Sequence, residues 1–219
     1  MDKGKVASHP AARIIKRFKE QPRERVLSDD ELRALWTGLD ARTGEAADAV
    51  RLRLLLGQRG QETAGMLWKE LDLESASWAM PGKRTKNKQP HVVALPPTAL
   101  EILKHRRRLV TDKDETHVFP GLTLTGDEHR ALGTLHGSAY EWKDLRRTVG
   151  TRLAGLGFDE TTIGRTLNHA RYTITAKHYN QHTYLEEIRR ALTAWDRELQ
   201  RILANQPKTK KVLPMRGRS

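Results

Sequence analysis

Apolar residues recur at helical spacing over much of the chain. Ser28 and Glu31 have the spacing of a capping box, in which each side chain bonds the backbone amide of the other residue at a helix start. Steps of three and four between apolar positions follow, most clearly from Leu185 to Ile202. The pattern predicts helices over residues 29–39, 45–56, 97–108, 141–156, 159–167 and 183–204. The second of these ends in consecutive leucines, so we expect it to lie deep in the core.

The pattern changes to short strand-like runs between Trp68 and Leu95. Apolar pairs alternate there with polar residues, and Pro81, Gly82 and Asn87 supply turns. This predicts a small three-stranded antiparallel sheet, with one more short strand at residues 118–119. The fold class is therefore α+β and mostly α, with one domain over residues 26–205. We expect residues 1–25 to be a basic linker or arm, and residues 206–219 to be a basic, disordered tail.

The composition indicates that the protein binds a polyanion. The 219-residue chain has 40 Lys and Arg against 27 Asp and Glu, a net charge of +13, which is typical of nucleic-acid-binding proteins. Cysteine is absent, which excludes disulfides and cysteine-ligated metals. No apolar run reaches the length of a membrane span and no signal peptide is recognisable, so we expect a cytoplasmic protein without membrane segments.

Two of the polar segments could bind an anion or serve the fold. In "GQRGQE", Arg59 stands between two glycines directly after an apolar helix, and an ordinary ion pair with Glu62 explains it equally well. In "GKRTKNK", cations crowd a turn between two strands. They could reach a phosphate, or they could protect a sheet edge from pairing with other strands. The cations of this turn are Lys83, Arg84, Lys86 and Lys88.

Two further segments lie closer to the C-terminus. In "KDLRRT", Lys143 and Arg146 share one face of a predicted helix near its start, an arrangement that suits an anion. The alternative is a basic helix surface. In "LNHARYTITAKHYN", His169 follows a turn and Tyr179 stands ten residues later.

Taken together in their order along the chain, these four segments resemble the active-site residues of the tyrosine recombinases. The resemblance is strongest to phage and prophage integrases. The resemblance covers roughly residues 25–203 and includes the contexts "GQRGQE", "RTKN", "KDLRRT", "LNH" and "KHYN". It implies a helical catalytic domain that cuts and rejoins DNA through a 3′-phosphotyrosine, with no metal or cofactor. The catalytic residues that it implies are Arg59, Lys86, Lys143, Arg146, His169 and Tyr179.

The resemblance also implies a role for each residue, and Lys143 would either hold the phosphate or share the proton transfer with the tyrosine. Arg59 and Arg146 would bind the non-bridging phosphate oxygens, with a further hydrogen bond from His169. Lys86 would protonate the leaving 5′ oxygen, and its pKa would be lowered by neighbouring cations. Tyr179 would be the nucleophile, in preference to Tyr172, which is too near His169, and to Tyr184, which opens the last helix. The residues that we expect to contact DNA outside this set are Lys83, Arg84, Lys88, Arg106, Arg107 and Arg147.

Two departures from the family pattern leave alternatives open. Lys143 occupies a position where the family usually has His, and type IB topoisomerases are similar in placing Lys there. Tyr179 lies one position beyond the usual spacing from His169, and His178 occupies the usual one. The alternatives are DNA relaxation of the topoisomerase type, or a catalytically degenerate DNA-binding remnant.

Partners follow from the resemblance. We expect double-stranded DNA attachment sites as substrate, for integration or excision of a prophage or mobile element. Tyrosine recombinases usually act as four protomers on two duplexes and carry an N-terminal core-binding domain. Such a domain does not fit before Arg25, so we expect a homotetramer on DNA for the full-length form and a monomer for this fragment.

Overall fold

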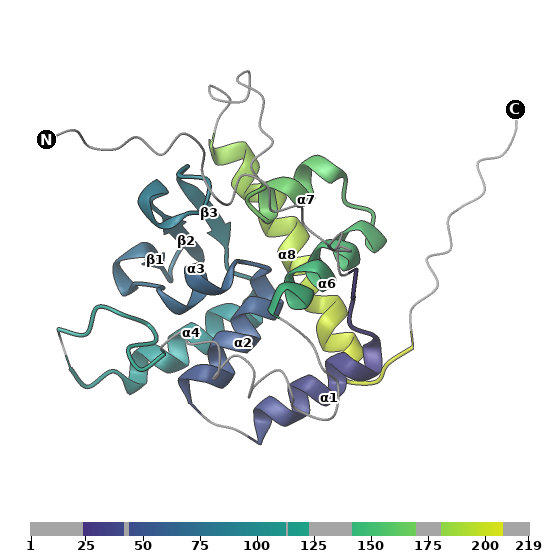
Figure 1. The fold of residues 1–219 in the computed structure, drawn as a ribbon, viewed down its shortest axis with the longest axis horizontal. Helices are drawn as coiled ribbons and strands as arrows, with labels where there is room; N and C mark the ends of the chain where they lie inside the picture. Colours follow the sequence, from purple (N-terminus) through teal and green to yellow (C-terminus); the bar gives the residue numbers. More distant parts are fainter. Residues whose placement is uncertain (1–23, 42–43, 113, 123–141, 170–180, 208–219) are drawn as a thin grey trace, which may run out of the picture.

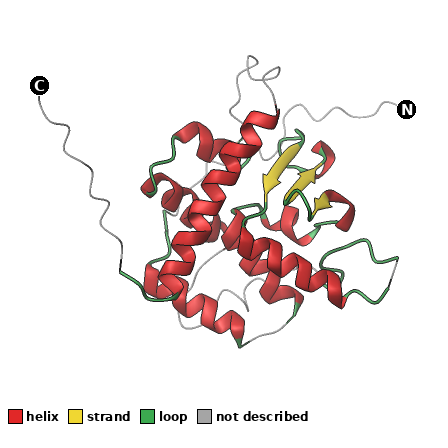
Figure 2. Ribbon diagram, turned by 180° about the vertical axis from the view of Figure 1, so that it is seen from behind, coloured by secondary structure: helices red, strands yellow, loops and turns green. Residues whose placement is uncertain are grey.

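The computed structural model describes residues 24–41, 44–112, 114–122, 142–169 and 181–207. It is mostly helical, with a small sheet at one side (Figures 1 and 2). Residues 1–23 of the expected N-terminal arm, most of the expected basic tail and Tyr179 lie outside the described residues.

The two N-terminal helices form where the apolar pattern predicts them. Helix α1 (Asp29–Asp40) begins with the expected capping box, in which Ser28 Oγ accepts from the Glu31 amide at 3.2 Å and Glu31 Oε2 accepts from the Ser28 amide at 2.9 Å. Helix α2 (Glu45–Leu56) has the predicted bounds, and it is buried on nearly all sides toward its end.

The sheet has the predicted three strands. β1 (Leu71–Asp72) pairs with β2 (Ser77–Met80), and β2 pairs with β3 (His91–Ala94), all antiparallel in the order β1-β2-β3. Two 3₁₀ turns accompany it: η2 (Trp68–Glu70) directly precedes β1, and η3 (Gly82–Arg84) lies in the connection between β2 and β3. The strands are short because alternation extends over only a few residues between turn-forming segments.

The other predicted helices also form. They are α4 (Pro97–Leu109), α6 (Trp142–Gly155), α7 (Glu160–Thr166) and α8 (Gln181–Leu203). The structure adds a five-residue helix, α3 (Gly60–Ala64), which is too short to leave an apolar period in the sequence.

The strand predicted at residues 118–119 is wrong. One isolated bridge, between Leu67 and His117, forms instead, and the Val118 amide donates to the Met66 carbonyl at 2.9 Å. Val118 and Phe119 are nevertheless buried, which explains the apolar signal. Pro120 follows directly and cannot donate a further ladder hydrogen bond.

Helix α8 organises the core. It contacts α1, α2, α4, α6, α7 and β3, and in Figure 1 it runs through the molecule from α7 to α1. Its apolar stripe is buried from Ile188 to Ile202, and Trp195 Nε1 donates to the Leu54 carbonyl of α2 at 2.8 Å. None of the helices in the described part is both long enough and apolar enough to cross a membrane.

His91, at the start of β3, is buried among groups of both charge signs. Burial lowers its pKa to about 4, and Arg146 and Arg59 act in the same direction. Glu62 and a hydrogen bond with the Thr166 backbone oppose the shift. The ring is therefore neutral in the folded protein at pH 7.

We expect Trp195→Ala to lower the free energy of unfolding by about 3–5 kcal/mol, because it removes a large buried side chain and a buried hydrogen bond. Urea unfolding followed by circular dichroism measures this change. The matched control is Arg197→Ala, two residues along on the exposed side of α8, which should stay within about 0.5 kcal/mol of the wild type. Equal, small effects for both would contradict the central place of α8.

We expect acid to destabilise the protein through His91. Its folded-state pKa lies below the unfolded value of about 6.5, so the unfolded chain binds the proton more tightly. The His91 contribution to the free energy of unfolding is therefore complete above pH 6.5. It falls by about 3 kcal/mol as the pH falls toward 4. Urea unfolding of wild type and His91→Phe at several pH values measures it, and the variant should lack this part of the slope. Parallel pH profiles would contradict the buried, neutral state of His91.

Candidate active site

Arg59 is placed by the turn that ends α2. Gly57 has φ of 67°, and a Cβ there would approach Leu167 Cδ2 to 2.6 Å, so only glycine fits. The chain then turns into α3 with Arg59 as its N-cap. Glu62 holds this residue twice, through the Arg59 amide at 3.0 Å and through Arg59 Nη1 at 3.0 Å. The ion pair that sequence left as an alternative is therefore present.

Arg146 comes from α6 and reaches the same place. Its Nη1 donates to the Gly57 carbonyl at 2.8 Å, and its Nη2 donates to the Leu167 carbonyl. These carbonyls belong to the C-caps of α2 and α7, where helix dipoles favour positive charge. Burial lowers the pKa of Arg146 to about 10, and the charge of Arg59 adds to this effect. The guanidinium still carries its charge at neutral pH.

The turn after α7 joins the two arginines. Asn168 has φ of 52°, a left-handed conformation that asparagine tolerates, and its carbonyl accepts from Arg59 Nη2 at 3.1 Å. Adjacent residues, Leu167 and Asn168, thus each bind one arginine. His169 follows, fixed by its amide, which donates to the Gly164 carbonyl at 2.8 Å.

The side chain of His169 is exposed, and its pKa is lowered by partial burial and by the charges of Arg146 and Arg59. A neutral imidazole results at pH 7. Such a ring can donate a hydrogen bond from one nitrogen and accept a proton at the other.

The β2–β3 connection also reaches this turn. Asn87 Nδ2 donates to Asn168 Oδ1 at 2.6 Å, which brings the neighbouring Lys86 to the side of the molecule that carries His169. Lys86, Lys83 and Lys88 are exposed, as is Lys143, which lies three residues before Arg146 on α6. No sequence pattern indicated the Asn87–Asn168 contact.

Two of the arginines expected to contact DNA have partners inside the protein. Arg84 pairs with buried Glu70 at 2.7 Å and donates to the Glu62 carbonyl at 2.7 Å. Arg106 is buried, pairs with Glu45 and Asp48, and donates to the Val118 carbonyl at 3.0 Å. Both guanidiniums therefore already have carboxylate and carbonyl partners in the folded protein.

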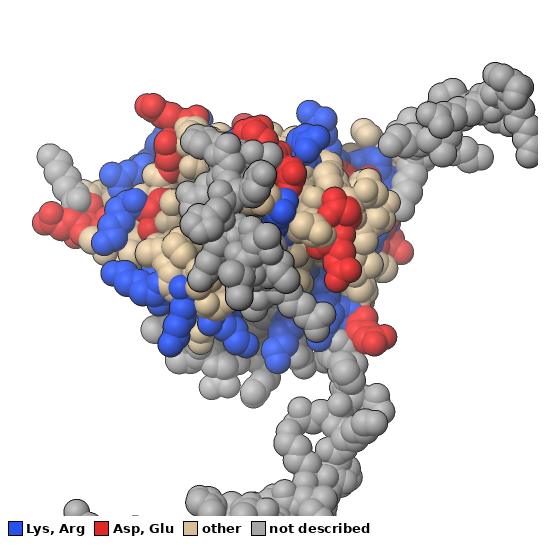
Figure 3. Space-filling view, turned by 90° about the horizontal axis from the view of Figure 1, so that it is seen from above, with Lys and Arg blue, Asp and Glu red and all other residues tan. Residues whose placement is uncertain are grey.

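The other two expected arginine contacts remain accessible. Arg107 is exposed and lies over the Trp68 ring at 5.1 Å, and Arg147 is partly exposed and pairs with Asp144 at 3.1 Å. Figure 3 shows Lys and Arg side chains crowding the lower left of the face seen from above, with acidic side chains mainly along its upper edge and right side.

The tyrosines divide between described and undescribed residues. Tyr179, the expected nucleophile, and Tyr172 lie outside the described part of the chain. Tyr184 is described, and the Arg165 guanidinium of α7 lies 3.6 Å from its ring centroid. Arg165 also pairs with Glu187 at 2.7 Å, so Tyr184 belongs to a contact that fastens the start of α8 to α7.

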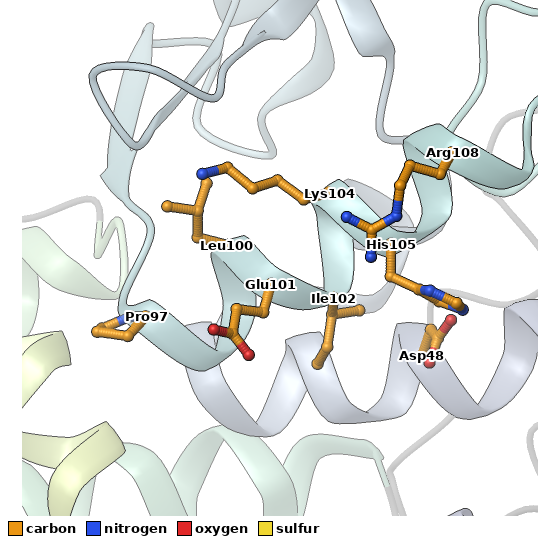
Figure 4. Close-up of a pocket in the computed structure, with 8 residues that line it drawn as sticks. All are labelled: Asp48, Pro97, Leu100, Glu101, Ile102, Lys104, His105 and Arg108. Atoms are coloured by element: carbon orange, nitrogen blue, oxygen red, sulfur yellow. The ribbon is translucent and has the colours of Figure 1, made fainter.

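A depression of about 670 Å³ lies elsewhere, along α4 (Figure 4). Its lining includes Leu100, Glu101, Lys104 and Arg108, and none of the residues around the arginine pair. Among the described residues, no group of three His, Cys, Asp or Glu gathers as a metal site would require.

Comparisons with known proteins show that the fold is shared. Solved structures with a similar fold include the integrase of mycobacterium phage Brujita, at TM-score 0.61 and 19% identity, covering 88% of this chain and 66% of that one. XerA recombinase matches at TM-score 0.54 and 19% identity, covering 87% and 67%. The Tn1549 transposon integrase, solved with circular intermediate DNA, matches at TM-score 0.52 and 16% identity, covering 74% and 62%.

Sequence comparison identifies the family. The integrase of Enterobacteria phage P4 is 26% identical over 170 residues, which is 67% of this chain and 38% of that protein. The chain thus spans about two fifths of that relative. The model of the phage integrase family matches residues 25–186, a range that contains both arginines, Lys86, Lys143, His169 and Tyr179. The chain therefore belongs to the phage integrase family.

Proposed function

We propose that this chain is the catalytic domain of a site-specific DNA recombinase that cuts and rejoins strands through a 3′-phosphotyrosine. The observation that carries the proposal is the arginine pair, held by backbone carbonyls of Gly57, Leu167 and Asn168 beside His169. The reaction would serve integration or excision of a prophage or mobile element, as family membership suggests.

The arginine pair supplies what phosphoryl transfer needs. Each guanidinium has five N–H donors, and the contacts described above use only some of them. The remaining donors can bind the non-bridging oxygens of a phosphate, whose negative charge grows in the transition state. Because Gly57 and Leu167 hold Arg146 through neutral carbonyls, its positive charge remains available to the DNA.

The covalent step uses the residues around this pair. The phenol oxygen of Tyr179 forms a bond to phosphorus while the bond from phosphorus to the 5′ oxygen breaks. The Lys86 ammonium gives a proton to the leaving 5′ oxygen. The neutral ring of His169 can take up the phenol proton, and Lys143 adds a cation near the start of α6. The guanidinium charges take the place that metal ions have in many phosphoryl-transfer enzymes, so this chemistry needs no cofactor.

Double-stranded DNA attachment sites are the proposed substrate. XerH recombinase has been solved bound to its difH substrate and the Tn1549 integrase with circular intermediate DNA, which supports DNA as the partner of this fold. We propose four protomers on two duplexes for the full-length form and a monomer for this chain. The proposed site of action is the cytoplasm of a bacterial cell or phage-infected host.

A pool of short suicide duplexes tests the function without a known target site. Each duplex has a randomised sequence and a nick, so that cleavage releases a short oligonucleotide and traps the protein on the DNA. Denaturing gels detect the adduct, and sequencing identifies the preferred site. If no adduct formed at any sequence, the chain would be a DNA-binding remnant without catalytic activity. Adduct with plasmid relaxation but without strand exchange would show the topoisomerase activity.

We expect Arg146→Lys to reduce the rate of adduct formation about 10²–10³-fold, the usual loss for one transition-state donor. Lysine keeps the charge, but it cannot bridge two carbonyls and present a planar fork to the phosphate. The matched control is Arg197→Lys on the exposed side of α8, which should cleave at the wild-type rate. Urea unfolding of both variants checks that they are folded. Wild-type cleavage by folded Arg146→Lys would refute the assigned role.

We expect Tyr179→Phe to abolish the adduct, because phenylalanine has no oxygen to attack phosphorus. Tyr184→Phe should retain it, since the ring that contacts Arg165 is kept. Mass spectrometry of the peptide linked to DNA maps the attachment site directly. Phosphate on Tyr184 or Tyr172 would make the assignment wrong.

A further inference from the structure

One side-chain hydrogen bond joins the two loops that carry the proposed acid and His169. Asn87 Nδ2 donates to Asn168 Oδ1 at 2.6 Å, although the residues are 81 positions apart in sequence. Lys86 directly precedes the donor, and His169 directly follows the acceptor. The bond therefore ties the position of one loop to the position of the other.

The acceptor side of this bond is rigid. Asn168 is 4% exposed, and its backbone carbonyl is held by Arg59 at 3.1 Å. Its amide donates to the Arg165 carbonyl at 3.0 Å, so both polar groups of its backbone are bound. Asn168 thus offers a fixed oxygen at the edge of the arginine pair.

The donor side is a compact turn with a second anchor. Thr85 Oγ1 bonds the carbonyls of Gly82 and Gln89 at 3.0 and 2.7 Å, which closes the turn on itself. Arg84 fastens its beginning to Glu70 and to the Glu62 carbonyl. Asn87 fastens the tip, where Lys86 projects. Loss of the Asn87 contact would release the tip while Arg84 kept the rest of the connection in place.

We propose that the Asn87–Asn168 hydrogen bond is a latch that positions Lys86 for proton delivery to the leaving 5′ oxygen. The inference rests on the proposed function, because Lys86 needs a position only if a strand is cut. Asn87 and Asn168 are positioning residues and do not touch the phosphate. In the step they support, the bond from tyrosine oxygen to phosphorus forms, the bond from phosphorus to the 5′ oxygen breaks, and the proton of the Lys86 ammonium moves to that oxygen.

The first experiment measures the latch without DNA. Asn87→Ala removes the donor together with Oδ1, which accepts from the Gln89 amide at 3.2 Å inside the turn. Asn168→Gly removes the acceptor alone, leaves that turn bond in place and suits the left-handed backbone, so it isolates the latch. Hydrogen exchange of residues 82–90, followed by mass spectrometry, should become about tenfold faster in both, since tenfold corresponds to the roughly 1.4 kcal/mol of a good hydrogen bond. The control is Gln89→Ala, an exposed neighbour in the same turn, which should exchange like the wild type. Unchanged exchange in both asparagine variants would overturn the latch.

The second experiment asks what the latch positions. Adduct formation is compared on the duplex selected above and on the same duplex with sulfur replacing the 5′ oxygen of the scissile phosphate. A thiolate leaves without a proton, so a defect in the acid disappears on the sulfur substrate. We expect Lys86→Ala to form the adduct about 10²–10⁴-fold more slowly than the wild type on the oxygen substrate, and at a rate close to that of the wild type on the sulfur substrate. Asn87→Ala and Asn168→Gly should slow adduct formation on the oxygen substrate by a smaller factor, about 10–100-fold, and should also regain the wild-type rate on the sulfur substrate.

Arg146→Lys separates the two kinds of defect, because it should be slow on both substrates. Asparagine variants that are equally slow on both substrates would show that the bond serves the arginine pair, which overturns the role for Lys86. Wild-type rates in those variants would overturn it too. A wild type that forms no adduct on either substrate would refute the proposed function itself and the catalytic role with it, while the exchange experiment would still decide whether the latch exists.

Discussion

Two positive charges must lie close together in this protein, and most of the fold around them serves that requirement. Arg59 and Arg146 repel each other, and burial makes the charge of Arg146 still more costly. Carboxylates would remove the repulsion but would also cancel the charge that a phosphate needs. The structure uses one carboxylate, Glu62, and otherwise relies on carbonyl oxygens. Partial negative charges at two helix ends hold the guanidiniums and leave the pair with a net positive charge.

This arrangement requires segments far apart in the chain to meet within hydrogen-bond distance. The C-terminal end of α2, the middle of α6 and the turn after α7 supply the contacts. α8 packs against all three helices and fixes their separation. The apolar stripe of α8 therefore acts on the site indirectly. A defect in its packing would move carbonyl oxygens that hold the arginines.

The sequence predicts the helices well where burial leaves a long periodic pattern, as in α2 and α8. It fails at α3, which is too short for a period, and at Val118–Phe119, where apolar residues are buried without forming a strand. The order of the polar motifs singled out both arginines and His169, which lie around one turn in the structure. It could not separate exposed cations from cations used inside the fold. Arg106 differs from Arg107 only in having acidic partners on α2, some sixty residues earlier in the chain.

Gly57 belongs to the site around the arginine pair although it has no side chain. Any side chain at this position would strike Leu167, and the backbone carbonyls of these same two residues hold Arg146. A genetic screen for loss of recombination would therefore place position 57 among the arginines, although it carries no functional group.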